Sequence, residues 1–344
     1  MSVGVAIIGS GIFAREQHLP AVQAAPSLTL KALYSRSLAS AQALSTNLTN
    51  VDLYSDDAGA GKAYKDLLAR DDIKGVIIAL PIPAQPEYIK AALSAGKHVL
   101  SEKPIAQDMA TARSLLQWYD EHVDKAKATW GVAENYRYID SFLYGAEKVR
   151  ELGRVLGFST KVHLMVQPGA KYYETSWRKT PTHQGGFLLD GGVHFIAGTR
   201  LLLPTTTPPV ALTAFSTQLQ AHLSPVDTID SIWKLSNGSS GTFSASFGTT
   251  FAGSEYRVAC ERGSVTVGRG FVVVQPTGMA EIRRDFPDEG SGVKQEVRAW
   301  AEKIESAQEL DERQCPVEAL RDLEILEAML RSGENAGKSV ELEA

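Results

Sequence analysis

Short apolar runs alternate with helical patterns over the first 132 residues of the chain. The run from Val3 to Gly9 is almost entirely apolar and is bounded by glycines, as expected for a buried parallel strand. Four more runs are candidate strands: Leu28–Tyr34, Gly75–Leu80, His98–Ser101 and Ala128–Val132. Helical spacing predicts helices over Phe13–Ala25, Ala63–Ala69, Pro86–Ala95 and Asp108–His122. This order predicts an α/β domain over residues 1–132, with a doubly wound parallel sheet.

Two stretches of this region are less regular. Pro20 lies inside the first predicted helix, so it should kink that helix or begin a second helical segment. The glycines and aspartates of Ser45–Gly61 indicate a loop around one short strand.

The pattern changes after Val132, where apolar and polar residues begin to alternate. A helix is predicted over Tyr144–Leu152, and helices over Val293–Ser306 and Val317–Arg331 follow near the end. The candidate strands are Val155–Val166, Val210–Leu219, Thr228–Leu235, Gly241–Phe247, Tyr256–Cys260, Ser264–Val267 and Val272–Gln275. Residues 133–344 are therefore predicted to form an α+β domain with an open, largely antiparallel sheet. One sheet face should pack on helices, and the half-apolar other face predicts a homodimer.

The first candidate strand ends in a glycine-rich turn. Gly9-Ser-Gly11-Ile12-Phe13-Ala14 fits the pattern G-x-G-x-x-A between a strand and a helix. Gly9 permits the tight turn, Gly11 lets a pyrophosphate approach the backbone, and the following amides face its charge. The turn predicts a Rossmann dinucleotide site, with a ligand-free glycine turn as the alternative.

The end of the second candidate strand indicates which dinucleotide is bound. An NAD site needs Asp or Glu there to accept a hydrogen bond from the ribose 2′-OH. This chain has Ser35, Arg36 and Ser37 instead, which suit a 2′-phosphate. NADP(H) is therefore predicted, unless Arg36 is only a solvated loop arginine.

A lysine follows the fourth candidate strand, in Glu102-Lys103-Pro104. The carboxyl ends of such strands present ligands, and Pro104 disfavours helical backbone at Lys103. Lys103 could then polarise a carbonyl or move a proton beside the nicotinamide. The alternative is an ordinary surface lysine.

A second chemical cluster is Asp190-Gly-Gly-Val-His194. The two side chains are four residues apart, so on an α-helix they share a face, and the carboxylate would orient the imidazole. His194 is therefore a candidate acid/base. A satisfied core histidine and a metal site are alternatives, but no third ligand has suitable spacing, so no metal is predicted.

Other segments are expected to line the same site. Trp177 and Arg178 could lie against a polar substrate or the nicotinamide, or could belong to an ordinary loop. Asn135 follows the last strand of the first domain, Leu80 ends the third candidate strand, and Pro81 follows it. We expect Leu80, Pro81, Glu102 and Asn135 to contact the dinucleotide.

Taken in order, these motifs resemble the glucose–fructose oxidoreductase/inositol dehydrogenase family over nearly the full length. The chain is most similar to fungal NADP(H)-dependent members whose substrate is unassigned. The resemblance implies a Rossmann domain, a C-terminal α/β domain that often dimerises through its sheet, and a catalytic lysine and histidine. These roles fall on Lys103 and His194, with Asp190 supporting. Two departures weaken the transfer of a polyol substrate: Ala197 replaces an Asp, and Leu80–Pro86 lacks an Asn and a His.

Composition excludes several classes of protein. A net charge of −5 argues against a nucleic-acid or polybasic membrane surface. The distant Cys260 and Cys315 exclude a disulfide scaffold or a thiolate zinc site. No apolar run approaches the ~18 residues of a membrane span, and no signal peptide is indicated.

The prediction is a cytoplasmic NADP(H)-dependent oxidoreductase. It would move a hydride between nicotinamide C4 and a small carbonyl compound or secondary alcohol, with Lys103 and His194 as acid/base pair. Two alternatives are a non-catalytic NADP(H)-binding regulator and a glycosidase-like lyase. Lys103 and His194 argue against the first, and Ser35–Ser37 argues against the second because such lyases usually use NAD.

Overall fold

The computed structural model describes residues 2–306 and 310–343. The chain forms two compact units, each with its own sheet. Unit 1 comprises Met1–Glu134 and Val293–Leu320, and unit 2 comprises Asn135–Gly292 and Arg321–Ala344. The division into sequence domains 1–132 and 133–344 stays a prediction.

Unit 1 contains a six-stranded parallel sheet in the order β3-β2-β1-β4-β5-β6. Its strands are β1 (Val3–Ile8), β2 (Leu28–Ser35), β3 (Asp52–Ser55), β4 (Gly75–Ile78), β5 (His98–Glu102) and β6 (Trp130–Ala133). The predicted doubly wound sheet is therefore confirmed, including the short strand inside Ser45–Gly61. The strand order reverses between β1 and β4, and ligands bind open α/β sheets beyond the carboxyl ends of the strands at this point.

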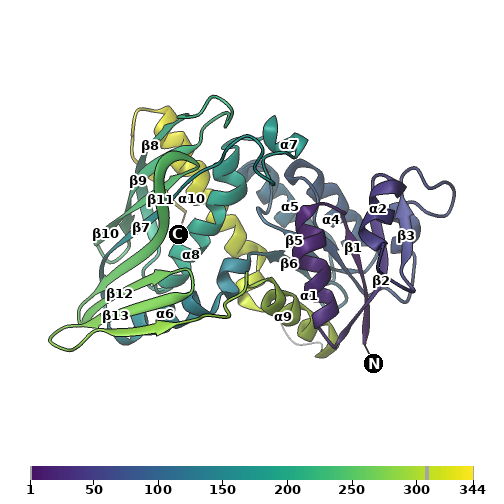
Figure 1. Cartoon of the computed structure of the whole chain (residues 1–344), viewed down its shortest axis with the longest axis horizontal. Helices are drawn as coiled ribbons and strands as arrows, with labels where there is room; N and C mark the ends of the chain where they lie inside the picture. The colour runs from purple at the N-terminus through teal and green to yellow at the C-terminus, as the bar shows by residue number, and fades with distance from the viewer. Residues whose placement is uncertain (1, 307–309, 344) are drawn as a thin grey trace. The chain divides into compact units, whose positions relative to one another are not determined.

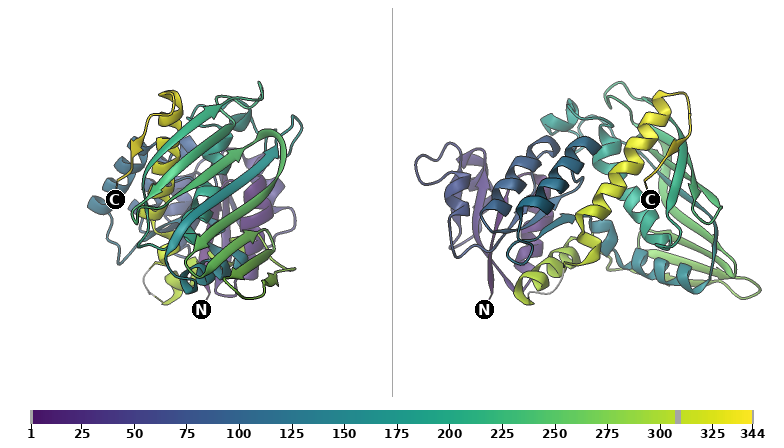
Figure 2. Two further views of the ribbon diagram at one scale, coloured as in Figure 1. Left: turned by 90° about the vertical axis from the view of Figure 1, so that its left-hand side faces the viewer. Right: turned by 180° about the vertical axis from the view of Figure 1, so that it is seen from behind.

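Helices cover both faces of this sheet (Figure 1). They are α1 (Leu19–Ala24), α2 (Leu38–Ser45), α3 (Tyr64–Leu68), α4 (Gln85–Ser94), α5 (Met109–His122) and α9 (Val293–Ser306), with the short helices η2 (Ile82–Ala84) and η5 (Glu312–Gln314). Helix α1 lies in front of the sheet in Figure 1, with α4 and α5 behind it, and Figure 2 agrees. Trp300 of α9 is fully buried in one core cluster with Val5, Ile7 and Ile77. Helix α2 was not predicted, because only Ala41 and Leu44 of its sequence are buried.

Pro20 shapes the helix that follows the glycine turn. Residues Ala14–His18 form a π-helical segment, η1, and the N–H of Leu19 bonds to the carbonyl of Ala14, five residues back. The α-helix α1 begins at Leu19, so the predicted second helical segment is confirmed. The wider π turn lies beside Pro20, which has no N–H to continue an α-helical ladder.

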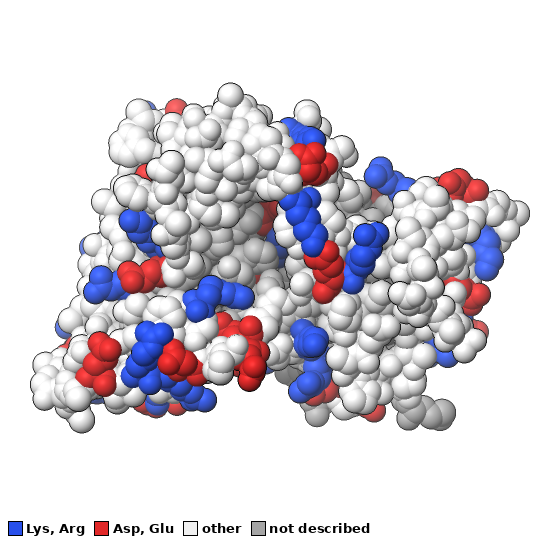
Figure 3. Space-filling view, viewed as in Figure 1, with Lys and Arg blue, Asp and Glu red and all other residues white. Residues whose placement is uncertain are grey.

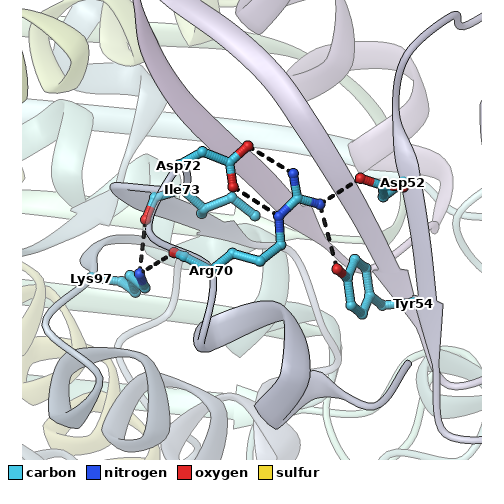
Figure 4. A network of polar contacts seen from close by, with 6 residues as sticks. All are labelled: Asp52, Tyr54, Arg70, Asp72, Ile73 and Lys97. Atoms are coloured by element: carbon cyan, nitrogen blue, oxygen red, sulfur yellow. Dashed lines mark hydrogen bonds and ion pairs between the residues drawn. The ribbon is translucent and has the colours of Figure 1, made fainter. Parts of the chain in front are cut away.

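Lys97, between α4 and β5, has a structural role (Figure 4). Its ammonium donates to the carbonyl oxygens of Arg70 and Ile73, at 2.7 and 2.9 Å. Burial lowers the pKa of Lys97. The Arg70 guanidinium in turn forms ion pairs with Asp72 and with Asp52 on β3. These ion pairs connect the loop before β4 to strand β3.

Unit 2 contains a nine-stranded sheet in the order β14-β13-β12-β11-β7-β10-β9-β8-β15. All neighbours are antiparallel except β10 and β7. Its strands are β7 (Val155–Met165), β8 (Pro209–Thr217), β9 (Thr228–Leu235), β10 (Ser240–Ser246), β11 (Gly248–Cys260), β12 (Gly263–Gly268), β13 (Phe271–Pro276), β14 (Ile282–Asp285) and β15 (Val340–Glu341). The predicted, largely antiparallel sheet is confirmed. The segment Tyr256–Cys260 is only the second half of β11, which has a register shift between Gly248 and Gly253.

One face of the second sheet packs against helices. These are α6 (Asp140–Glu151), α8 (Val193–Leu202) and α10 (Pro316–Glu334), with the shorter η3 (Asn135–Tyr138), η4 (Leu188–Gly192) and α7 (Ser176–Lys179) nearby in the chain. Asp322 of α10 is fully buried and pairs with both Arg137 and Arg200. No helix of the described residues lies over the other face of the strands, as the left panel of Figure 2 shows. Phe215, Ile232 and Phe251 are more than half exposed.

Candidate functional site

The turn after β1 has the geometry that a pyrophosphate requires. Gly9 has a φ of 113°, and a Cβ there would lie only 2.2 Å from the carbonyl oxygen of Ala79. A Cβ on Gly11 would instead meet nothing within 4 Å. Gly9 is thus required by the close approach of the Ala79 carbonyl, just after β4, and Gly11 leaves the backbone accessible to a ligand. Ile12 and Phe13 begin the helical run, so their amides point out of its first turn. These residues fit a dinucleotide.

The loop after β2 adjoins this turn. The Ser10 hydroxyl donates to Ser35 Oγ at 2.8 Å. Ser37 caps α2 by accepting from the amide of Ser40 at 3.3 Å. Arg36 is exposed and, within the described part of the chain, makes no hydrogen bond or ion pair. Its guanidinium is therefore available to an anion from solution.

Sequence reasoning missed a carboxylate beside this loop. Asp57, two residues after β3, accepts from the amide of Leu38 at 2.7 Å and from the Ser55 hydroxyl at 2.6 Å. These hydrogen bonds lower the pKa of Asp57. Its neighbour Asp56 accepts from the Tyr34 hydroxyl at 2.6 Å. The adjacent aspartates after the predicted short strand were the available signal, because parallel strands bring their carboxyl ends together.

Lys103 lies directly after β5 and is half-buried. The Lys103–Pro104 peptide bond is cis. The carboxylate of the preceding Glu102 accepts a hydrogen bond from His18 Nε2 at 2.7 Å. His18 is fully buried, and its ring meets Phe13 edge-on at 5.3 Å. Glu102 thus ties the lysine loop to the helix that follows the glycine turn.

Leu80 and Pro81 follow β4 at the same edge of the sheet. A Cβ added to Gly9 would lie 3.4 Å from Leu80 Cδ2, so the Leu80 side chain packs beside the glycine turn. The Pro81 carbonyl accepts from the amide of Ala84 at 2.9 Å and begins the short helix η2. In unit 1, the structure thus brings the predicted turn, Ser35 and Leu80 together.

In unit 2, Asp190 is held by an arginine. Arg178 Nε donates to Asp190 Oδ2 at 2.6 Å, and Nη2 is 3.4 Å from Oδ1. Asp190 lies in the π-helical η4, whereas His194 is the second residue of α8. The four-residue spacing therefore does not follow one α-helical face, because a π turn is wider. His194 stacks on Tyr136 with ring centroids 4.9 Å apart.

A small pocket surrounds the Arg178–Asp190 pair. Its other lining residues are Trp177, Pro181, His183, Gly186 and Phe187. The Arg178 guanidinium lies over the Trp177 ring at 3.9 Å from its centroid. Burial lowers the pKa of His183, with the charge of Asp190 acting in the opposite direction. Trp177 and Arg178 thus line this pocket from the short helix α7, and their contact with a substrate or the nicotinamide stays a prediction.

The remaining predicted positions also lie in unit 2. The side-chain amide of Asn135 donates to the carbonyl oxygen of Ser291 at 2.5 Å. Ala197 is fully buried in α8. Because Lys103 and His194 belong to different units, their action as a pair stays a prediction.

Among residues 2–306 and 310–343, no helix has the length and hydropathy to cross a bilayer. No three His, Cys, Asp or Glu side chains among them gather as metal ligands would. On the face drawn in Figure 3, Lys and Arg are interspersed with Asp and Glu.

Family models match most of the chain. Residues 3–128 match "Oxidoreductase family, NAD-binding Rossmann fold", and residues 147–342 match "Oxidoreductase family, C-terminal alpha/beta domain". The chain belongs to the Gfo/Idh/MocA oxidoreductase family. The resemblance stated from sequence is therefore confirmed, and so is a nicotinamide dinucleotide as the family's cofactor.

Individual relatives agree with the family models. Dehydrogenase FPY6 of Fusarium mangiferae is 41% identical, with 96% of each chain covered. D-xylose 1-dehydrogenase (NADP(+)) 2 of Haloferax volcanii is 27% identical over 98% of this chain and 99% of its own. A solved oxidoreductase structure from Thermotoga maritima has a TM-score of 0.87 and 26% identity, covering 99% of this chain and 98% of that one.

Proposed function

We propose that this member of the Gfo/Idh/MocA family is an NADP(H)-dependent oxidoreductase acting on CH–OH or C=O groups. The observation that carries the cofactor preference is Arg36, which is exposed beside Ser35 and has no partner among the described residues. A guanidinium flanked by hydroxyls suits the dianionic 2′-phosphate.

The chain's own residues would hold the cofactor as follows. The backbone at Gly9, Gly11, Ile12 and Phe13 would bind the pyrophosphate, because unpaired amides at a helix start favour anions. Ser35, Arg36 and Ser37 would bind the 2′-phosphate. The nicotinamide half would be lined by Leu80, Pro81, Glu102, Lys103, Asn135, Trp177 and Arg178.

The acid/base chemistry would fall on Lys103 and His194. When bound, the nicotinamide would supply or accept the hydride. His194 would donate a proton to the oxygen of a substrate undergoing reduction, and Lys103 would stabilise the charge developing on that oxygen. Asp190 would support this chemistry. Its carboxylate is held in place by Arg178, whose Nε donates to Asp190 Oδ2 at 2.6 Å.

A sugar-like molecule or another small aldehyde or ketone is the proposed substrate. The related Haloferax volcanii protein is a D-xylose dehydrogenase, and the pocket of unit 2 combines an aromatic wall with a fixed ion pair. Aromatic faces and charged hydrogen-bonding groups together suit a ligand with both C–H and O–H surfaces.

A homodimer through the second sheet, in the cytoplasm, completes the proposal. The helix-free face exposes Phe215 at 65%, Ile232 at 53% and Phe251 at 65%. Exposed apolar side chains on the open face of a sheet favour an isologous contact.

The test is NADPH oxidation across a panel of aldoses, aldehydes and ketones, with the reverse reaction on the matching alcohols. Turnover of a carbonyl compound with NADPH supports the proposal. Tight NADPH binding with no turnover across the panel would instead favour the non-catalytic regulator.

A further inference from the structure

The Asp57 carboxylate stands beside the loop that would receive the adenosine ribose. It follows β3, whereas the loop Ser35–Ser37 follows β2, and these strands are neighbours in the sheet (Figure 1). Asp57 reaches the first turn of α2, where it accepts from the amide of Leu38 at 2.7 Å. That amide directly follows Ser37, one of the proposed phosphate ligands.

The carboxylate is fixed at one oxygen and open at the other. Both hydrogen bonds, from Leu38 and from the Ser55 hydroxyl at 2.6 Å, end on Oδ1. No other described residue is hydrogen bonded to Oδ2, and the side chain is exposed. Oδ2 can therefore accept a hydrogen bond from a ligand without breaking an existing contact.

Asp57 and Arg36 favour different dinucleotides. A carboxylate accepts from the ribose 2′-OH of NAD(H) but repels the 2′-phosphate of NADP(H). A guanidinium attracts that phosphate. Arg36 is not paired with Asp57, so the two charges do not cancel within the described part of the chain.

We propose that Asp57 is a specificity-determining residue, which supplies the carboxylate that β2 lacks and limits the preference of Arg36 for NADP(H). The chain then binds both dinucleotides, and the balance between these two side chains sets the ratio of their affinities. This inference rests on the proposed dinucleotide site.

The experiment measures dissociation constants of NADPH and NADH by calorimetry on the full chain, at low ionic strength. The decisive variant is Asp57→Asn, because the amide oxygen can still accept from Leu38 and Ser55 while the charge is lost. We expect NADPH to bind more tightly and NADH more weakly, so that the affinity ratio shifts about tenfold toward NADPH. Added salt should reduce the shift.

The matched control is Asp52→Asn. Asp52 is an exposed carboxylate at the other end of β3, paired with Arg70 at 2.7 Å (Figure 4). Asp52→Asn removes one negative charge at the end of β3 away from the Ser35–Ser37 loop, so the affinity ratio should stay within about twofold of the wild-type value. Arg36→Ala should move the ratio toward NADH.

Two outcomes would overturn the inference: an unchanged affinity ratio in Asp57→Asn, or an equal shift of the ratio in Asp52→Asn. An unchanged ratio with an equal loss of both affinities would show that Asp57 only caps α2. Failure of the wild-type chain to bind either dinucleotide would instead refute the proposed function. The two failures are therefore distinguishable.

Discussion

Nε2 of His18 lies 2.7 Å from Oε1 of Glu102, 84 residues further along the chain. The imidazole is fully buried, and the carboxylate is 12% exposed. This contact joins the helix after the glycine turn to the residue that precedes Lys103. It links the predicted phosphate-binding segment to the predicted catalytic loop inside unit 1.

Loss of this contact should destabilise the fold. His18→Ala leaves the mostly buried Glu102 carboxylate without its partner, which should cost about 2–3 kcal/mol in the free energy of unfolding. Urea titration measures the loss. His18→Gln, whose amide nitrogen can still reach Glu102, should recover part of it, and equal losses in both variants would show that the hydrogen bond contributes little.

Lys103 and His194 carry the proposed chemistry. Lys103→Met and His194→Ala should each lower turnover by about 10²-fold or more. The dissociation constant of NADPH should change by less than about threefold in both, since neither is a proposed phosphate ligand. Lys65→Met and His122→Ala, at exposed helical positions, are the matched controls. A variant at Lys103 or His194 with near wild-type turnover would remove that residue from the mechanism.

His98 should make unit 1 sensitive to acid. Its Nδ1 lies 3.2 Å from the Thr129 amide, which donates to it, and burial lowers the pKa of His98 from 6.5 to about 4. Between pH 6.5 and about 4, the His98 imidazole is therefore protonated more readily in the unfolded chain than in the folded chain. The stabilisation is fully present above pH 6.5 and is lost as pH falls toward 4, by about 2 kcal/mol.

Urea unfolding at pH 7 and at pH 5 measures this loss. His98→Asn, whose side-chain oxygen can accept from Thr129, should unfold with a smaller pH dependence than the wild type over this range. An identical pH dependence in the two proteins would assign the acid sensitivity to other groups.

The helix-free face of the second sheet should mediate self-association. Ile232→Lys places a charge among the exposed apolar residues, so it should convert a dimer to monomers, because burying an unpaired ammonium is unfavourable. Light scattering after gel filtration measures the mass. Met279→Lys, which changes an exposed residue in the turn after β13, should leave the mass unchanged; a wild-type monomer would end the dimer proposal.

Much of the local structure could be predicted because single segments encode it. Val3–Ile8 must be buried on both faces, and Gly9 is required by a positive φ and by the carbonyl oxygen of Ala79. Helix α5 begins where Asp108 accepts from the Thr111 amide, a short-range contact visible as a capping residue in sequence. Helix α2 was missed because its small, weakly patterned residues are selected by packing and by the Ser37 cap.

The sequence by itself determined the alternation of strands and helices, the glycine turn and the positions of the motif residues, since these depend on neighbours within a few residues. Tertiary structure alone decided that Asp57 meets the loop after β2, that Arg178 holds Asp190, and that α9 packs in the core of unit 1. Such contacts depend on which strands lie side by side and on how a π turn rotates a side chain. Those are properties of the packed chain, and no single segment encodes them.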